Sequence, residues 1–393
     1  MKRTILLAMM VSLFAVSAYA QKAPKRQGYI SEFDQDQLSF KGDVAEVTIL
    51  RINYKSHNEN DIKDTSTSTY KFNKRGDVIE SDINMLLKSR HKHIYNADGR
   101  MIKTLIYDDN KLTSYTLHLY GANGKIIEDR VYRANEKTLF SRTRYKYDAN
   151  GNQTSKIRTG NDGEIYHKQS YRYDSKNRMI EHTCVINEEE PDEQYNEYFV
   201  YDAKGNLIES RFRDLNSKYF HQTINKYDSK DRKIETLEYY QFDKGYQSRT
   251  KTTYKYDAYN NIVEEVEYND KGALSYKTTR NFNSYKNLIE ETKYDGSGAI
   301  SYKYCYKYDA NQNKIESTKY DKNGELEYKL LMKYDSKNRK IEELVYNKAD
   351  VLLEKSCWAY DHMDNEIEKS FYDYRKDPVA AISKLVKKIV YRQ

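Results

Sequence analysis

The stretch that decides the fold is Tyr-Asp-Ala-Lys-Gly-Asn-Leu-Ile-Glu at residues 201–209, because close copies of it recur along most of the chain. An aromatic residue in the position of Tyr201, here called the anchor, marks each of twelve copies. The anchors are Phe72, Tyr95, Tyr120, Tyr147, Tyr173, Tyr201, Tyr227, Tyr256, Phe282, Tyr308, Tyr334 and Tyr360. Successive anchors lie 23 to 29 residues apart, most often 26. A fixed period of this length predicts a repeat architecture in which neighbouring units share their packing.

Each copy contains the residues of a tight turn. Four residues after the anchor, ten of twelve copies carry Gly, Asn or Asp. These residues tolerate the positive φ that a tight hairpin loop requires. Seven residues after the anchor, eleven of twelve copies carry Ile or Val, and Glu follows in ten. An aromatic residue before a turn and a β-branched residue after it predict two paired strands.

A second turn divides each period, as between Tyr294 and Ile300 or between Tyr320 and Leu326. Each unit therefore contains two strands of roughly eight residues. Alternation along residues 300–308 supports this, because Tyr302, Tyr304 and Tyr306 share one face of a strand.

The repeat predicts an all-β protein with a long antiparallel meander of β-hairpins across residues 70–374, in about 12 units. Because each strand pair adds roughly 20 to 25° of twist, we expect the sheet to coil into a superhelical or partly open, shell-like form. Residues 21–69 are expected to form an N-terminal arm and capping strands. Residues 375–393 are expected to form a C-terminal cap, either a short amphipathic helix or a closing strand.

Composition excludes several classes of protein. The chain has 393 residues, 32% of them charged, and the mean hydropathy of -1.01 excludes a polytopic membrane protein. The 41 tyrosines argue against disorder, since disordered chains are poor in aromatic residues. The formal net charge of +7 leaves no concentrated basic field, so nucleic acid is not an expected partner.

Residues 1–20 have the three parts of a secretory signal peptide. Lys2 and Arg3 precede an apolar run over residues 5–16, and the small residues Ala18 and Ala20 follow it. The run is shorter than the ~20 residues of a spanning helix, so we expect cleavage and export rather than a transmembrane segment. The expected destination is the periplasm, the cell surface or the medium.

The cysteine spacing argues against a disulfide. Cys305 and Cys357 lie 52 residues apart, which is two repeat periods. Two periods correspond to about four strands, or roughly 19 Å across a sheet. A disulfide needs Cα atoms within ~7 Å, so we predict free thiols.

The string completed by Tyr201, Asp202, Gly205, Asn206 and Ile208 resembles the YD repeat of the Rhs/YD-repeat family, over about three quarters of the chain. MORN-like repeats are a looser second match. The resemblance implies a spiralling β-sheet, which in large members closes around a toxic passenger. This chain resembles a short secreted member, because it lacks the family's conserved core and self-cleavage segment and no passenger follows the repeats. The resemblance therefore implies an architecture without a reaction.

No catalytic residue, metal ligand or cofactor is predicted. The sequence shows no Gly-rich phosphate loop, serine elbow or suggestive Cys and His spacing. His91 and His93 share one face of a strand and could begin a zinc site, but histidine here replaces tyrosine in an aromatic stripe. Turns such as residues 148–152 lack the spacing of a calcium loop, so turn chemistry explains them.

Two lengthened periods give the only indication of a binding side. Residues 188–193 lengthen one interval and residues 241–246 another, and both insertions fall at the second turn of their unit. Insertions on one side of a repeat array often mark its binding side, although tolerated drift in loop length is the alternative. We predict that Tyr195, Tyr240 and Tyr246 stack on a sugar or a partner protein, since aromatic rings combine contact area with a hydroxyl.

The leading hypothesis is a noncatalytic, exported repeat protein that acts as an extended binding or cell-envelope scaffold for a glycan or a protein. The first alternative is a hydrolase whose site is assembled across repeats. The second is an accessory or antagonist of a larger YD-repeat toxin system. The oligomeric state is left open.

Overall fold

The computed structural model describes residues 38–54, 62–84, 88–134, 138–186, 194–242, 245, 247–375 and 380–392. The described residues form 26 β-strands and no helix. None of them belongs to a helix that could cross a membrane. The predicted leader at residues 1–20 lies outside the described residues.

The strands of the first half are β1 (Val44–Tyr54), β2 (Ile62–Phe72), β3 (Val78–Asn84), β4 (Lys88–Tyr95), β5 (Met101–Asp108), β6 (Lys111–Tyr120), β7 (Ile126–Arg133), β8 (Leu139–Tyr147), β9 (Gln153–Gly160), β10 (Ile165–Tyr173), β11 (Met179–Ile186), β12 (Tyr195–Tyr201) and β13 (Leu207–Asp214). Those of the second half are β14 (Phe220–Tyr227), β15 (Lys233–Gln241), β16 (Gln247–Tyr256), β17 (Ile262–Tyr268), β18 (Leu274–Phe282), β19 (Leu288–Tyr294), β20 (Ile300–Tyr308), β21 (Lys314–Asp321), β22 (Leu326–Tyr334), β23 (Lys340–Asn347), β24 (Leu352–Tyr360), β25 (Glu366–Asp373) and β26 (Ala380–Tyr391).

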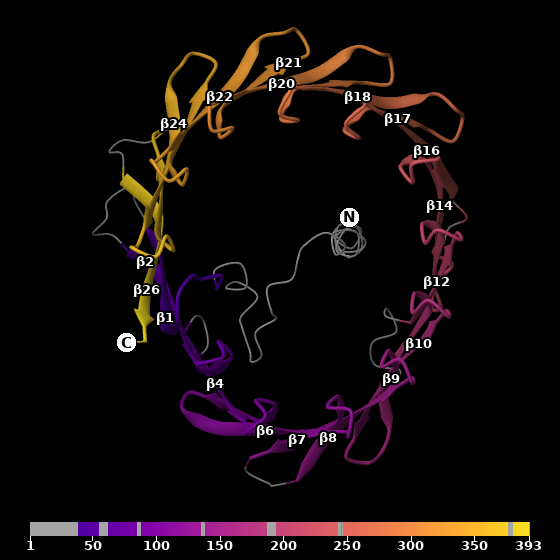
Figure 1. Cartoon of the computed structure of the whole chain (residues 1–393), viewed down its shortest axis with the longest axis vertical. Coiled ribbons are helices and arrows are strands. Elements are labelled where there is room, and N and C mark those ends of the chain that lie inside the picture. The colour runs from indigo at the N-terminus through magenta and orange to yellow at the C-terminus, as the bar shows by residue number, and fades with distance from the viewer. Residues whose placement is uncertain are drawn as a thin grey trace.

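The sheet closes on itself. Each strand pairs antiparallel with the next strand in the chain, as β1 does with β2 and β25 with β26. The last strand, β26, then pairs with β1, from Val44 opposite Tyr391 to Asn53 opposite Ser383. Figure 1 shows the resulting ring around a central opening. At ~4.8 Å per strand, the ring has a circumference of roughly 125 Å.

The expected superhelical or partly open sheet is therefore wrong, whereas the expected all-β meander of antiparallel hairpins is correct. The physical reason is that an open sheet would leave β1 and β26 as unpaired edges, which are costly. Twist accumulated over the strands brings these two edges together. Residues 380–391 form the closing strand, which was one of the two alternatives expected for the C-terminal segment.

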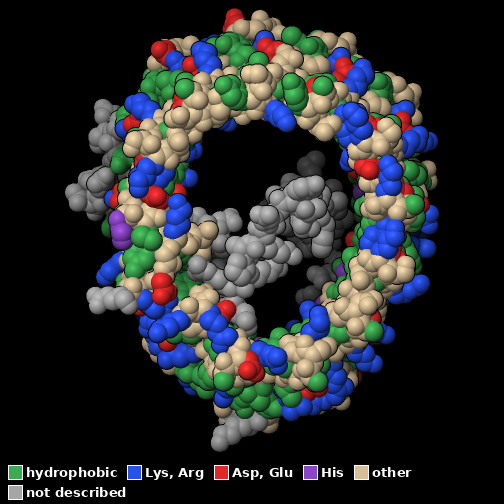
Figure 2. All heavy atoms as spheres, in the orientation of Figure 1, with side chains coloured by type: hydrophobic (Ala, Val, Ile, Leu, Met, Phe, Trp, Pro, Cys, Tyr) green, Lys and Arg blue, Asp and Glu red, His purple; other side chains and the backbone are tan. Residues whose placement is uncertain are grey.

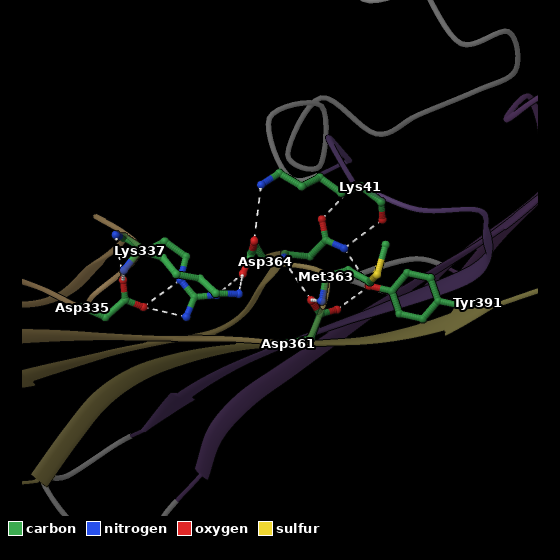
Figure 3. Close-up of polar contacts among 9 residues, drawn as sticks. Lys41, Asp335, Lys337, Asp361, Met363, Asp364 and Tyr391 are labelled. Atoms are coloured by element: carbon green, nitrogen blue, oxygen red, sulfur yellow. Dashed lines mark hydrogen bonds and ion pairs between the residues drawn. The ribbon is translucent and has the colours of Figure 1, made fainter.

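The largest apolar core lies at this closure, which we call the seam. Seven buried residues form one cluster there, and four partly buried residues pack against it. The buried residues are Leu38, Val44, Val47, Ile49, Tyr70, Phe72 and Val78. Polar contacts continue the seam toward the β24–β25 turn, where the side chains of Tyr391 and Lys41 lie beside Asp361 and Asp364 (Figure 3).

Away from the seam, the anchor tyrosines connect neighbouring units. The hydroxyl of Tyr308 donates a hydrogen bond to the backbone oxygen of Leu288, at 2.8 Å, in the preceding unit. Tyr334 donates in the same way to Lys314, at 2.9 Å. All ten tyrosine anchors make this bond. The repeated tyrosine therefore serves as a link between hairpins as well as an apolar side chain.

The predicted turns are confirmed at every copy. Gly, Asn or Asp four residues after the anchor adopts positive φ, and so do the two exceptions, Lys286 at 67° and Gln312 at 68°. The β-branched residue seven positions after the anchor is the extra residue of a β-bulge, as Ile289 is between Leu288 and Glu290. The bulge turns Ile289 toward solvent, so that 37% of it is exposed.

The pairing register separates two faces. The anchor face carries the anchors and the tyrosines two residues before them, such as Tyr306. The opposite face, here called the ladder face, carries glutamates that each bridge two lysines on the neighbouring strands. Glu264, for example, lies 2.7 Å from Lys255 and 2.8 Å from Lys277. The same arrangement recurs at Glu80, Glu235 and Glu342.

The anchor face is the more buried of the two. Away from the seam, most buried residues lie on it, and they are His93, Thr104, Ser141, His182, Cys184, Thr236, Thr252, Thr278, Ser317 and Met332. Side chains converge on the concave side of a closed sheet, so this difference places the anchor face toward the opening. In Figure 2, lysine and arginine side chains lie all round the ring, on its outer surface and also at the edge of the opening.

The turns lie on two rims. A turn that follows an anchor joins an even strand to the next odd strand, and these turns form the main rim. Every other connection joins an odd strand to the next even one and lies on the secondary rim. Cys305 in β20 and Cys357, four strands away in β24, form no disulfide, as expected.

Candidate binding site

Both insertions lie on the secondary rim. One joins β11 to β12 and the other joins β15 to β16, so they extend from the same edge of the sheet. Residues 187–193, 243, 244 and 246 lie outside the described residues, and the predicted site residue Tyr246 is among them. Tyr195 and Tyr240, the other two predicted site residues, begin β12 and nearly end β15, beside the insertions.

The structure brings Tyr195 and Tyr240 into one row of aromatic rings on the anchor face. The ring of Tyr195 lies 5.2 Å from that of Phe212 and 5.4 Å from that of His182. Tyr240 stacks on His221 at 4.3 Å, and its ring lies 6.3 Å from that of Phe242. Tyr219 completes the row between Phe212 and Phe242. Most of the ring faces in this row already contact another ring.

Electrostatics also mark Tyr240 as a packed side chain. Burial, together with the negative charge of Glu238, raises the pKa of Tyr240. The hydrogen bond between His221 and Glu238 outweighs burial and lowers the pKa of that carboxyl group. The hydroxyl of Tyr240 is thus held neutral in a partly buried network, and a ligand would have to displace existing contacts to stack on its ring.

A groove of about 530 Å³ opens on the ladder face directly behind this row. Its apolar part consists of Ile224 and Leu237 with the ring of Tyr239, which also packs against Phe220 at 6.0 Å. Polar groups surround the apolar part, and they belong to Gln222, Glu238, Gln247, Ser248, Arg249 and Asp270. The size is within the range of small-molecule sites.

The groove combines an aromatic face with hydrogen-bond donors and acceptors. Arg249 supplies only donors, Asp270 only acceptors, and Gln222 and Gln247 supply both. Such a set suits a neutral ligand that has many hydroxyl groups. Sequence reasoning pointed to the turn beside this groove and chose Tyr240, whereas its neighbour Tyr239, which faces the other way, lines the groove.

A second polar cluster lies on the anchor face of β4–β8. Nδ1 of His93 lies 3.1 Å from the hydroxyl of Thr104, which lies 3.1 Å from Nε2 of His118. Nδ1 of His118 lies 2.7 Å from Asp129, and the hydroxyl of Tyr145 donates to the same carboxylate at 2.8 Å. This chain crosses five strands. Within the described ranges, no group of three His, Cys, Asp or Glu side chains could hold a metal ion.

A thiol and an imidazole also meet across strands. Sγ of Cys184 in β11 lies 3.2 Å from Nε2 of His167 in β10, but only 2% of Cys184 is exposed. The two residues lie 17 positions apart, so only the pairing register reveals the contact. A substrate in solution cannot reach this thiol in the closed sheet.

Comparisons with known proteins do not assign a family. No protein-family model matches the chain, and no curated protein is similar to it in sequence. A TcdB2-TccC3-Cdc42 structure matches 83% of this chain over 17% of its own, with 14% identity and a TM-score of 0.38. A TcdB2-TccC3-TEV structure matches 97% over 28% of its own, with 10% identity and a TM-score of 0.29.

A porin-like protein from Bacteroides uniformis matches 88% of this chain over 96% of its own, with 8% identity and a TM-score of 0.20. The chain thus spans less than a third of the TcdB2-TccC3 chains that it matches. Similarity at these TM-scores carries no argument about function. The resemblance to YD repeats rests on the sequence motif.

Proposed function

We propose that this protein is an exported, noncatalytic ring of YD-like repeats that serves as a binding scaffold of the cell envelope, and that its ligand is a carbohydrate. The groove beside the β15–β16 insertion carries this proposal, because it places Tyr239 among donors and acceptors at the point where the repeat lengthens. An aromatic ring with polar groups at its edge suits the apolar face and the hydroxyl rim of a sugar.

The test is binding of the mature protein to an array of envelope polysaccharides, followed by titration of any binder. The Tyr239→Ala variant should bind about tenfold more weakly, for a stacking contribution of roughly 1.5 kcal/mol. Tyr198→Ala is the matched control, since Tyr198 lies on the same face, is 40% exposed and does not line the groove.

Two outcomes would count against the proposal. Undiminished binding by the Tyr239→Ala variant would remove the groove as the site. If the protein binds only polypeptide partners and no polysaccharide raises its melting temperature, then the ligand is a protein rather than a carbohydrate.

One observation favours the alternative of a hydrolase. Thr104, His118 and Asp129 lie in the order of a nucleophile, a general base and an orienting carboxylate, on β5, β6 and β7. However, Thr104 is only 9% exposed and its hydroxyl also lies 3.1 Å from His93. A hydrolytic activity that is lost in the Thr104→Ala variant and retained in Thr116→Ala, on the next strand, would establish this function instead.

A further inference from the structure

A second cavity lies at the seam and is separate from the proposed carbohydrate groove. Its volume is about 800 Å³. It lies on the anchor face, near the secondary rim, and its walls come from both ends of the chain. They include Arg51 of β1, Ser66 of β2, Lys369 and Phe371 of β25 and Ser383 of β26.

Arg51 and Lys369 both line this cavity, as does Lys384, which lies 2.9 Å from Glu368. Arg51 and Lys369 are both register partners of Leu385, on opposite sides of β26. Their backbones are therefore two strands apart, or roughly 10 Å. In this structure the ammonium group of Lys369 lies 5.3 Å from the centre of the Trp358 ring on β24, so it would turn from that ring toward an anion in the cavity. Two long basic side chains at this spacing can reach one anion between them.

The other residues of the cavity wall indicate which further chemical groups the ligand has. Hydroxyl groups come from Thr65, Ser66, Ser356 and Ser383, and Phe371 provides an apolar surface. The one carboxylate in the wall, Asp64, already accepts a hydrogen bond of 2.7 Å from Asn53. The volume exceeds that of a single inorganic ion, and the hydroxyl groups suit a ligand that has hydroxyls of its own.

From these contacts we propose that the seam cavity binds an acidic sugar, whose phosphate or carboxylate lies between Arg51 and Lys369. The ligand contacts β1 and β2 from one end of the chain and β24, β25 and β26 from the other. It therefore holds the ring closed, since a ligand that binds only the folded, closed form stabilises that form. This site does not depend on the groove at β14–β17, and either can fail without the other.

The experiment measures the melting temperature and the affinity of the wild-type protein with four probes at low and high salt. The probes are glucose 6-phosphate, glucuronic acid, glucose and inorganic phosphate. We expect the two acidic sugars to raise the melting temperature and to bind more weakly at high salt, because charged groups near solvent are screened. Glucose should have no effect, and inorganic phosphate should bind more weakly than the acidic sugars.

Variants then locate the site. Lys369→Gln should weaken binding of the acidic sugars about tenfold, and Lys369→Arg should retain it because the charge remains. Lys388→Gln is the matched control, since Lys388 is exposed on the other face of the same seam. If the Lys369→Gln variant does not fold, Ser356→Leu takes its place. This substitution fills part of the cavity without removing a charge, and it should also weaken binding of the acidic sugars.

Hydrogen exchange distinguishes a ligand that holds the ring closed from one that binds adventitiously. Saturation with glucose 6-phosphate should slow amide exchange in β1 and β26 by at least about threefold, with no change in β18–β20, far from the seam. No change of melting temperature with either acidic sugar would overturn the proposal. Equal binding by Lys369→Gln and the wild type, or equal affinity for glucose and glucose 6-phosphate, would do the same.

Discussion

At the scale of single residues, the anchor hydroxyl explains why tyrosine rather than phenylalanine dominates this chain. Phenylalanine would cover the same apolar surface, but it could not bond to the carbonyl oxygen of the preceding unit. The hydroxyl of Tyr308 makes that bond at 2.8 Å, and that of Tyr360 makes it at 2.8 Å two units later. Most tyrosines therefore hold the array together, and their abundance by itself does not indicate a ligand.

Two anchors, Phe72 and Phe282, are phenylalanine, and Phe282, which follows another repeat, provides a test. Phe282 has no hydroxyl, so no bond reaches the backbone oxygen of Ile262, which stands where the other units accept one. We expect Phe282→Tyr to raise the free energy of unfolding by about 1 kcal/mol and Tyr308→Phe to lower it by a similar amount. Urea denaturation followed by circular dichroism measures both. Equal midpoints for the wild type and both variants would show that the bond contributes nothing.

The histidine cluster predicts a dependence of stability on pH. Burial, with repulsion from His91 and His118, lowers the pKa of His93 to about 4, compared with about 6.5 in an unfolded chain. Between these values only the unfolded chain takes up the proton. The contribution of neutral His93 is therefore complete above pH 6.5 and is lost as the pH falls toward 4, by roughly 3 kcal/mol.

The variant His93→Gln, which cannot titrate, should be less stable at pH 7 but lose less stability between pH 6.5 and 5 than the wild type. Denaturation curves at four pH values in that window check this. If the free energy of unfolding falls with pH equally in the two proteins, then His93 accepts a proton in the folded state as readily as in the unfolded chain. Carboxyl groups contribute to both proteins alike, so the difference isolates the imidazole.

At the scale of the hairpin, the turn position rather than the residue in it sets the backbone. Lys286 adopts a φ of 67° although lysine has no intrinsic preference for that region. We expect Lys286→Gly to raise the free energy of unfolding by about 0.5 to 1 kcal/mol, since the conformation no longer strains a side chain. The matched control is Lys322→Gly in the secondary turn after β21, where the residue with positive φ is Gly324. A gain in both variants would point to an effect on the unfolded chain instead.

Strands and turns could be predicted from the sequence because both depend on residues that are close together in the chain. The face of each side chain could be predicted only in part. The extra residue of each bulge, such as Ile289 or Ile341, breaks the alternation that the sequence suggests, and it turns an apolar side chain outward. The candidate site shows the same limit, because neighbouring tyrosines at 239 and 240 face opposite sides and only the pairing register tells which one lines a groove.

At the scale of the whole molecule, closure of the ring depends on the twist summed over all the strands and not on any single repeat. A few degrees of change in twist per strand, multiplied over 26 strands, separates a ring from an open spiral. No single repeat contains that information. The seam cavity could not be predicted for the same reason, since Arg51 and Lys369 become neighbours only after the ends of the sheet have met.

Closure also predicts how the protein fails. Ile389 pairs with Val47 and packs against the seam core, so Ile389→Pro removes a backbone donor and forces a bend near the C-terminal end of β26. The two freed edges then present unpaired backbone groups, which favour pairing with other molecules. We expect a lower melting temperature and, by light scattering, a shift to larger, concentration-dependent species.

Lys348→Pro is the control, because residue 348 is the second residue of an exposed turn. Proline fits this position, and the backbone nitrogen of Lys348 is not among the hydrogen-bond donors of that turn. An Ile389→Pro protein with unchanged mass, and with amide exchange in β1 as slow as in the wild type, would show that the ring does not depend on its seam.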